Sequence, residues 1–186
     1  IDCLLLSPSS LLQYLSGFRG LVDERLFLLV VPAEGEAFLL VHKLYELEVA
    51  CCAVGDVIVW NQNDDPVALL HAQLLERKLK LYRVGVNSSM RAQHLIALMQ
   101  MLHECDFCLA ESVVAPLRMI KDKQELNSLA HACSIADQAI EDVFLQGRYW
   151  IGKTEKEVWA ALQQVMTAKG LDDCFAGVST GANSAM

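Results

Sequence analysis

Three residues, His103, Cys105 and Cys108, form an H-x-C-x-x-C pattern that could bind zinc or carry thiol redox chemistry. A structural zinc site needs four ligands, and the sequence contains no second C-x-x-C pair and no H-x₃₋₅-H pair to supply them. A redox pair usually opens a helix, whose dipole lowers the thiol pKa, whereas this pair leads into an expected strand. The pattern therefore favours packed cysteines, and we predict that all seven cysteines are reduced and bind no metal.

The other residues that could act as acids, bases or ligands also lack the spacing of a catalytic site. The histidines form no close pair on one helix face, and the glycine-rich segment 177–183 lacks the lysine of a phosphate-binding loop. The acidic pairs lie at expected turns or helix caps, where solvated surface is a simpler interpretation than an acid/base pair. The histidines are His42, His71, His94, His103 and His131, and the acidic pairs are Asp23-Glu24, Asp64-Asp65 and Asp172-Asp173.

The composition narrows the class of protein and its partners. The chain carries a formal net charge of −8 with scattered lysines and arginines, which argues against a nucleic-acid partner. The longest apolar run, Leu26 to Val31, is far shorter than the ~20 residues that span a bilayer, so we expect no membrane span. Most cysteines lie in apolar segments, which indicates a reducing cytoplasm. Because no initiator Met opens the chain, we expect part of a longer protein.

Apolar periodicity and capping residues predict strands that alternate with helices through the first part of the chain. Gly35 lies between two apolar runs and supplies the positive φ of an antiparallel hairpin turn. The alternation with one hairpin predicts an α/β domain with a mixed β-sheet flanked by helices. The expected strands cover residues 2–6, 25–31, 37–41, 56–60, 80–86 and 107–114, and the expected helices begin at Ser9 or Ser10, Lys43, Asp65, and Ser88 or Ser89.

The alternation stops at residues 113–118, where we place a linker between a domain over residues 1–112 and a second unit over residues 119–186. Capping boxes at Asp122 and Thr154 predict two helices in the second unit, followed by a strand over residues 174–178 with no partner strand. This unit is therefore expected to be incomplete. The first helix should bury a stripe at steps of three and four that ends near Gly147: Leu126, Leu129, Cys133, Ala136, Ile140 and Val143.

Four segments, taken in order, carry the motifs of a known family. They are Y-L-S-G-F at residues 14–18, L-R-M-I-K-D-K-Q-E-L at 117–126, G-K-T-E-K-E-V at 152–158 and T-G-A-N-S-A at 180–185. Together they resemble the creatinase/aminopeptidase P family, which includes Xaa-Pro aminopeptidases and Xaa-Pro dipeptidases. The second segment is similar to the start of that family's catalytic pita-bread domain, and the fourth resembles the strand end that precedes a histidine.

The resemblance implies a creatinase-like N-terminal domain followed by the truncated start of an α+β pita-bread domain. In that family, two divalent metal ions (manganese, cobalt or zinc) are held in the C-terminal half by two Asp, one His and two Glu. This chain contains none of those motifs, so the resemblance implies no catalytic residue, no metal and no activity in the chain alone. For the full-length parent it implies a hydrolase of short proline-containing peptides that forms a homodimer.

The resemblance also implies that the N-terminal domain packs near the mouth of the active site. Tyr14, Phe18 and Arg19 are the candidates to contact substrate there. A simpler interpretation is that Tyr14 and Phe18 are core residues of a short helix, because aromatic residues at steps of four usually pack inward. Two other functions stay open on the same fold: a non-catalytic peptide-binding or assembly module, and a creatinase-like hydrolase of a small C–N bond.

Overall fold

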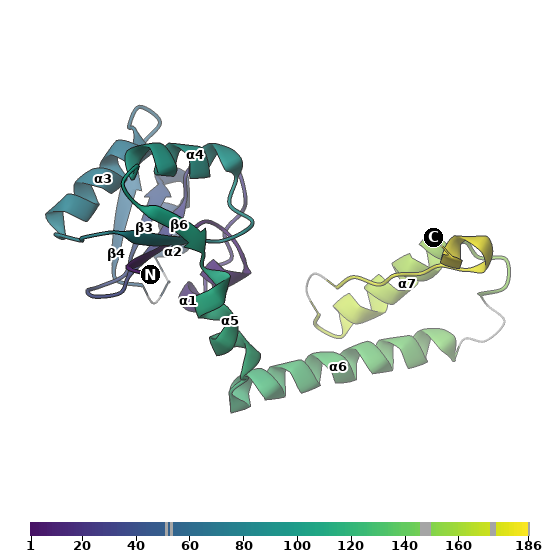
Figure 1. Cartoon of the computed structure of the whole chain (residues 1–186). Coiled ribbons are helices and arrows are strands. Elements are labelled where there is room, and N and C mark those ends of the chain that lie inside the picture. Colours follow the sequence, from purple (N-terminus) through teal and green to yellow (C-terminus); the bar gives the residue numbers. More distant parts are fainter. Residues whose placement is uncertain (51, 53, 146–149, 172–173, 186) are drawn as a thin grey trace. The chain divides into compact units, whose positions relative to one another are not determined.

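A computed structural model of the chain describes all residues except 51, 53, 146–149, 172, 173 and 186 (Figure 1). The chain forms two compact units, Ile1–Ile120 and Lys121–Met186. Residues 113–118, the expected linker, lie inside the helix Glu111–Met119, and the division between the units falls just after that helix.

The first unit is built on one six-stranded mixed sheet, as the alternating pattern predicts. Its strand order is β4-β3-β2-β1-β5-β6. β1 and β3 each pair with β2 in antiparallel register, whereas β1–β5, β5–β6 and β3–β4 are parallel. The strands are β1 Cys3–Leu6, β2 Leu28–Pro32, β3 Phe38–His42, β4 Asp56–Trp60, β5 Arg83–Val86 and β6 Asp106–Leu109. Gly35, with φ of 103°, makes the expected hairpin turn between β2 and β3.

Side chains alternate between the two faces along each strand, so both faces of this sheet carry apolar residues. Helices cover both faces (Figure 1). On one face, α3 and α4 pack Leu70, Leu74 and Leu98 against the strands. On the other face, α1, α2 and α5 pack a second apolar cluster that includes Leu12 and Val114. These helices are α1 Ser10–Ser16, α2 Glu46–Val49, α3 Pro66–Glu76, α4 Ala92–Met101 and α5 Glu111–Met119.

Capping explains where two of these helices begin. The Ser9 side chain accepts a hydrogen bond from the backbone N–H of Leu12, and Asp65 accepts from the N–H groups of Val67 and Ala68 ahead of Pro66. The expected start of a helix at Ser88 or Ser89 is wrong, because α4 begins at Ala92. Both serines instead make side-chain hydrogen bonds: Ser88 donates to Glu111, and Ser89 accepts from Asn87.

The expected strand over residues 107–114 is wrong in its second half. β6 ends at Leu109, although the N–H of Ala110 still donates to the carbonyl of Val86. From Glu111 the chain is helical, and Val114 is buried against the second apolar cluster. The predicted helix over residues 43–52 is also shorter, since a 3₁₀ turn at Lys43–Tyr45 leads into α2.

The second unit contains two helices, α6 Lys123–Phe144 and α7 Glu155–Ala168, that pack on each other. Both predicted capping boxes are present: Asp122 with Glu125, and Thr154 with Glu157. The expected strand over residues 174–178 is wrong, because residues 174–180 form no regular element. A 3₁₀ helix then covers Gly181–Ala185. The predicted helix end at Gly147 lies outside the described residues.

The buried face of α6 differs from the predicted stripe. Ile135, Ala139 and Val143 are buried, because these residues, four apart, are on the face that α7 covers. The exposed residues of the predicted stripe are Leu126, Leu129, Cys133 and Ile140. The expected stripe is therefore wrong at these four residues.

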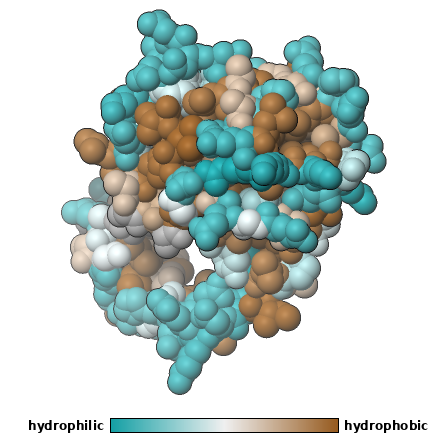
Figure 2. Space-filling model, turned by 90° about the vertical axis from the view of Figure 1, so that its left-hand side faces the viewer, coloured by the Kyte–Doolittle hydropathy of each residue, from teal (hydrophilic) through white to brown (hydrophobic). Residues whose placement is uncertain are grey.

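The surface also carries apolar side chains, which gather in patches on the face shown in Figure 2. None of the helices in the described part of the chain is long and apolar enough to cross a bilayer.

Candidate functional site

Helix α1 and the loop that follows it carry the three candidate residues. Gly17, with φ of 74°, ends the helix in a left-handed conformation, and its N–H donates to the carbonyl of Gln13 at 2.8 Å. Tyr14 has 40% of its surface exposed, and its hydroxyl donates to the carbonyl of Leu117 in α5 at 3.3 Å. The interpretation of Tyr14 as a core residue is therefore wrong.

Phe18 and Arg19 lie differently. The Phe18 ring stacks on Phe27 with centroids 5.3 Å apart and planes within 4°, and Phe27 meets Tyr45 edge-on at 6.0 Å. Phe18 is partly buried against the second apolar cluster, so the simpler interpretation is correct that it packs inward, but Phe18 follows the end of α1 and is not part of the helix. Arg19 follows on the exposed side of the loop.

A group of polar residues fixes the rest of the loop between α1 and β2. The Tyr45 hydroxyl donates to a carboxylate oxygen of Asp23, and the Arg25 guanidinium contacts the same oxygen at 3.0 Å. The backbone N–H of Arg25 donates to the other oxygen at 2.9 Å. The carbonyl of Glu24 lies 3.0 Å from the Gln93 amide nitrogen and 3.1 Å from His94 Nε2, both on α4. The loop is therefore tied to α4 and to the segment before α2.

These contacts shift the pKa values of Asp23 and Tyr45. Burial raises the pKa of Asp23, but hydrogen bonds from Tyr45 and from the N–H of Arg25, together with the Arg25 charge, outweigh burial and hold that pKa below its usual range. Burial and the hydrogen bond to Asp23 raise the pKa of Tyr45. At neutral pH the cluster therefore contains a carboxylate, a guanidinium and a neutral phenol.

Sequence reasoning missed this polar cluster and assigned Asp23 to solvated surface. The Asp23 side chain is only 21% exposed and is paired, so that interpretation is wrong. Its partner Tyr45 lies 22 residues away. No local spacing signals such a contact. By contrast, Asp64 and Asp65 do lie at a turn and a helix cap as predicted, and Asp172-Asp173 lies outside the described residues.

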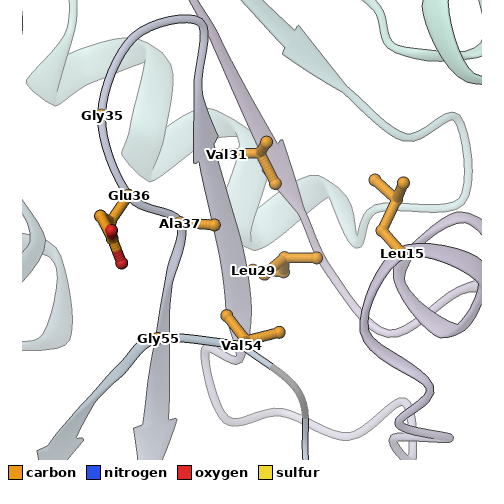
Figure 3. Close-up of a pocket in the computed structure, with 8 residues that line it drawn as sticks. All are labelled: Leu15, Leu29, Val31, Gly35, Glu36, Ala37, Val54 and Gly55. Carbon is orange, nitrogen blue, oxygen red and sulfur yellow. The ribbon is translucent and has the colours of Figure 1, made fainter.

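A hollow of about 620 Å³ lies beside the β2–β3 hairpin, near the end of α1 (Figure 3). The side chains of Leu29 and Val31 in β2, and of Val54 before β4, point toward the side where Leu15 of α1 lies. Glu36 points away from that side. Among the lining residues that the structure describes, the apolar side chains face the space, and the one acid, Glu36, points away from it. The space can accommodate an apolar group.

The cysteines and histidines of the described residues do not converge. No group of three or more His, Cys, Asp or Glu in that part of the chain could hold a metal ion. The thiols of Cys105 and Cys108 instead donate to the carbonyls of Leu81 and Val84, and burial raises the pKa of Cys105. Burial also raises the pKa of Cys3 to about 12. Cys51 lies outside the described residues, so the prediction for all seven cysteines stays a prediction.

The family model for the creatinase/prolidase N-terminal domain matches residues 1–120, the whole of the first unit. The chain belongs to this family. The similarity to known proteins also extends into the second unit of this chain. The probable dipeptidase PepE of Mycobacterium tuberculosis is 29% identical over 190 aligned positions, which cover 98% of this chain and 48% of that protein.

Solved structures agree with the fold of this creatinase/prolidase family member. A dipeptidase from Pyrococcus horikoshii superimposes with a TM-score of 0.79 at 32% identity, covering 91% of this chain and 46% of that one. Dipeptidase PepE from Mycobacterium ulcerans gives a TM-score of 0.74 at 30% identity, with 91% and 45% covered. The chain spans about half the length of these relatives.

Proposed function

We propose that this chain is the N-terminal part of a metallopeptidase that hydrolyses Xaa-Pro peptide bonds, of the aminopeptidase P or prolidase type. The observation that carries the proposal is the likeness to dipeptidases at 29–32% identity over more than nine-tenths of the chain. The likeness reaches past residue 120, so it includes the start of a second domain as well as the N-terminal one. Fold alone does not fix function, but sequence similarity through both units favours a shared activity.

The proposal includes two divalent metal ions, manganese, cobalt or zinc, in the full-length parent. The described residues of this chain do not fit such a site, because they bring no three potential ligands together. The ligands therefore belong to the other half of the parent, and this chain is expected to be inactive alone. A homodimer and a cytoplasmic location belong to the same proposal, because they come from the family resemblance and from the expected reduced cysteines.

Within this proposal, Tyr14 and Arg19 are the residues of the first unit that meet the substrate. Both are exposed at the end of α1 and on the loop after it, whereas Phe18 supports that loop by stacking on Phe27. The Asp23 cluster holds the same loop from its other end. The first unit thus presents a fixed loop whose role is to limit the size of the peptide that enters.

The test compares this chain with a version extended through the C-terminal half of the parent, each assayed on an Xaa-Pro dipeptide with added manganese. We expect hydrolysis by the extended protein alone, with loss of activity on adding a chelator. A dipeptide of the same first residue without proline is the matched control for specificity.

Two results would contradict the proposal in different ways. Hydrolysis by the short chain would show that it is not an inactive part. If neither protein hydrolyses the dipeptide and the extended one is folded, the result would favour the non-catalytic peptide-binding or assembly module. Hydrolysis of creatine in place of the dipeptide would favour the C–N hydrolase.

A further inference from the structure

A second hollow, of about 470 Å³, lies within the first unit between the end of α3 and the turn that joins β2 to β3. One wall is the segment that leads from α3 to β5. The other is formed by that turn and by Asp2, the residue ahead of β1. Unlike the apolar hollow in Figure 3, this one has charged side chains on both walls.

The segment between α3 and β5 forms a basic wall. Three of the 15 lysines and arginines, Arg77, Lys78 and Lys80, lie close together here, in a chain whose net charge is −8. Arg77 contacts Asp56 at 2.6 Å, and its guanidinium carbon lies 4.4 Å from the centre of the Phe38 ring. Lys78 and Lys80 are exposed, and their side chains have no hydrogen bond or ion pair with any residue that the structure describes. Two cationic charges are therefore left for a ligand.

The opposite wall carries two carboxylates. Asp2 Oδ2 accepts hydrogen bonds from the backbone N–H groups of Arg83 and Tyr82, at 2.8 and 2.7 Å. These bonds hold the pKa of Asp2 below its usual range, so its side chain is fixed and ionised at neutral pH. Glu34 is exposed in the turn, and its side chain has no partner among the described residues. Neither carboxylate forms an ion pair with a lysine of the basic wall, so the hollow keeps the two charges apart.

We propose that this hollow binds a small zwitterion, an amino acid or a short peptide with free termini. The carboxylate of the ligand pairs with Lys78 and Lys80. Its ammonium group pairs with Asp2 and Glu34. A ligand of one charge sign, such as phosphate, meets like charge on one wall, whereas a zwitterion is attracted by both walls.

The hollow also offers room and apolar surface for the rest of such a ligand. Its volume falls within the ~300–1,000 Å³ that is usual for small-molecule sites. Leu79 and Leu81 line it and are partly buried, so they can contact an apolar side chain of the ligand. The hollow shares no residue with the loop after α1. The inference therefore holds whether or not the parent is a peptidase.

The test is titration of this chain with alanylalanine, followed by the backbone amide signals in NMR spectra. Because exposed ion pairs each contribute little, we expect saturable binding with a Kd of about 1 mM. The signals that shift should be those of residues 33–35 and 78–81, which line the hollow. Raising the salt concentration should weaken the binding, since exposed charges are screened.

Two variants remove one charge from each wall. Lys78→Gly and Glu34→Gln should each weaken binding by about two- to fivefold, as expected for the loss of one exposed ion pair. Lys78 has φ of 56°, a conformation that favours glycine, so weaker binding by Lys78→Gly would not reflect a weakened fold. Arg91→Gln is the matched control and should bind normally, because it removes an exposed cation outside the hollow.

Capped peptides distinguish a zwitterion site from a site for one charge. Acetylation of the amino group and amidation of the carboxyl group each remove one charge of alanylalanine, and each should weaken binding. An acetylated peptide that binds as tightly as alanylalanine would show a simple anion site and overturn the inference. Absence of saturable binding up to about 10 mM, ten times the expected Kd, also overturns it. Binding that is unchanged in both Lys78→Gly and Glu34→Gln has the same consequence.

Discussion

The two units of the chain differ in how much apolar surface each one buries for itself. In Ile1–Ile120 the sheet is covered on both faces, and residues such as Leu5, Phe38 and Leu40 are fully buried. In Lys121–Met186 the described burial is confined to the contact of α6 with α7, at Ile135, Ala139, Val143, Leu162 and Met166. Capping boxes are well formed in the second unit. Capping signals are therefore enough to form the helices of the second unit, but two helices do not make the packed layers that a hydrophobic core requires.

The largest effect is expected from separating the units. A protein of residues 1–120 should fold alone and unfold cooperatively, because its two apolar clusters lie within it. A protein of residues 121–186 should lack a cooperative transition, since two helices with one shared face leave too little buried surface. Thermal melting followed by circular dichroism measures both. A sharp transition in the shorter piece would contradict the contrast between the units.

Limited proteolysis of the whole chain tests the same comparison without producing the two units as separate proteins. Cleavage should come first within residues 121–186, leaving a protected piece that ends near Ile120. Early cleavage inside residues 40–100 would show that the first unit is not the more stable one.

A second prediction contrasts one leucine from each unit. Leu40→Ala should lower the free energy of unfolding of the first unit by about 2–5 kcal/mol, since this side chain is fully buried in β3. Leu126→Ala in α6 should change stability by less than about 0.5 kcal/mol, because Leu126 is 55% exposed. Urea unfolding measures both changes. A large effect of Leu126→Ala would mean that the sequence-based stripe describes a contact made in solution.

The stripe on α6 shows what periodicity can and cannot predict. Apolar residues at steps of three and four correctly indicated a long helix from Lys123 to Phe144. These residues cover a wider part of the helix surface than a single neighbouring helix can bury. Where α7 packs decides that Ile135 and Ala139 are covered while Leu126 and Leu129 are not. The apolar pattern of α6 alone does not specify where α7 packs on it.

Local signals also predicted most of the first unit. The strand at residues 56–60, the hairpin at Gly35 and the caps at Ser9 and Asp65 are confirmed. The helix α5 was missed, and its first residue, Glu111, accepts hydrogen bonds from Ser88, 23 residues earlier, a contact that no local pattern indicates. The Asp23 cluster was missed for the same reason. Pairwise contacts between distant segments have no local pattern to reveal them.

A third prediction tests the Asp23 cluster through pH. Because the folded pKa of Asp23 is below the value of about 3.9 in an unfolded chain, its ionised form stabilises the fold above about pH 4. This contribution is lost as the pH falls through the lower, folded pKa. Unfolding free energies of wild type and Asp23→Asn, measured from pH 7 down to pH 2.5, should therefore differ most at neutral pH and converge in acid. A constant difference across that range would show that Asp23 acts through packing instead.

The smallest expected effect is a gain in stability at the end of α3. Lys78 has φ of 56°, a left-handed conformation that costs a side-chain-bearing residue about 1–2 kcal/mol, and it follows the last turn of the helix. Its N–H donates to the carbonyl of Leu75, and the N–H of Leu79 donates to Leu74, which is the hydrogen-bond pattern that glycine favours at a helix end. Lys78→Gly should therefore stabilise the first unit by about 0.5–1 kcal/mol, since part of the relief is lost to the greater freedom of glycine in the unfolded chain. Lys80→Gly is the matched control, because it removes the same charge two residues away, at a position without positive φ, and should slightly destabilise. Equal effects of the two changes in urea unfolding would mean that charge, rather than backbone conformation, decides the outcome at this helix end.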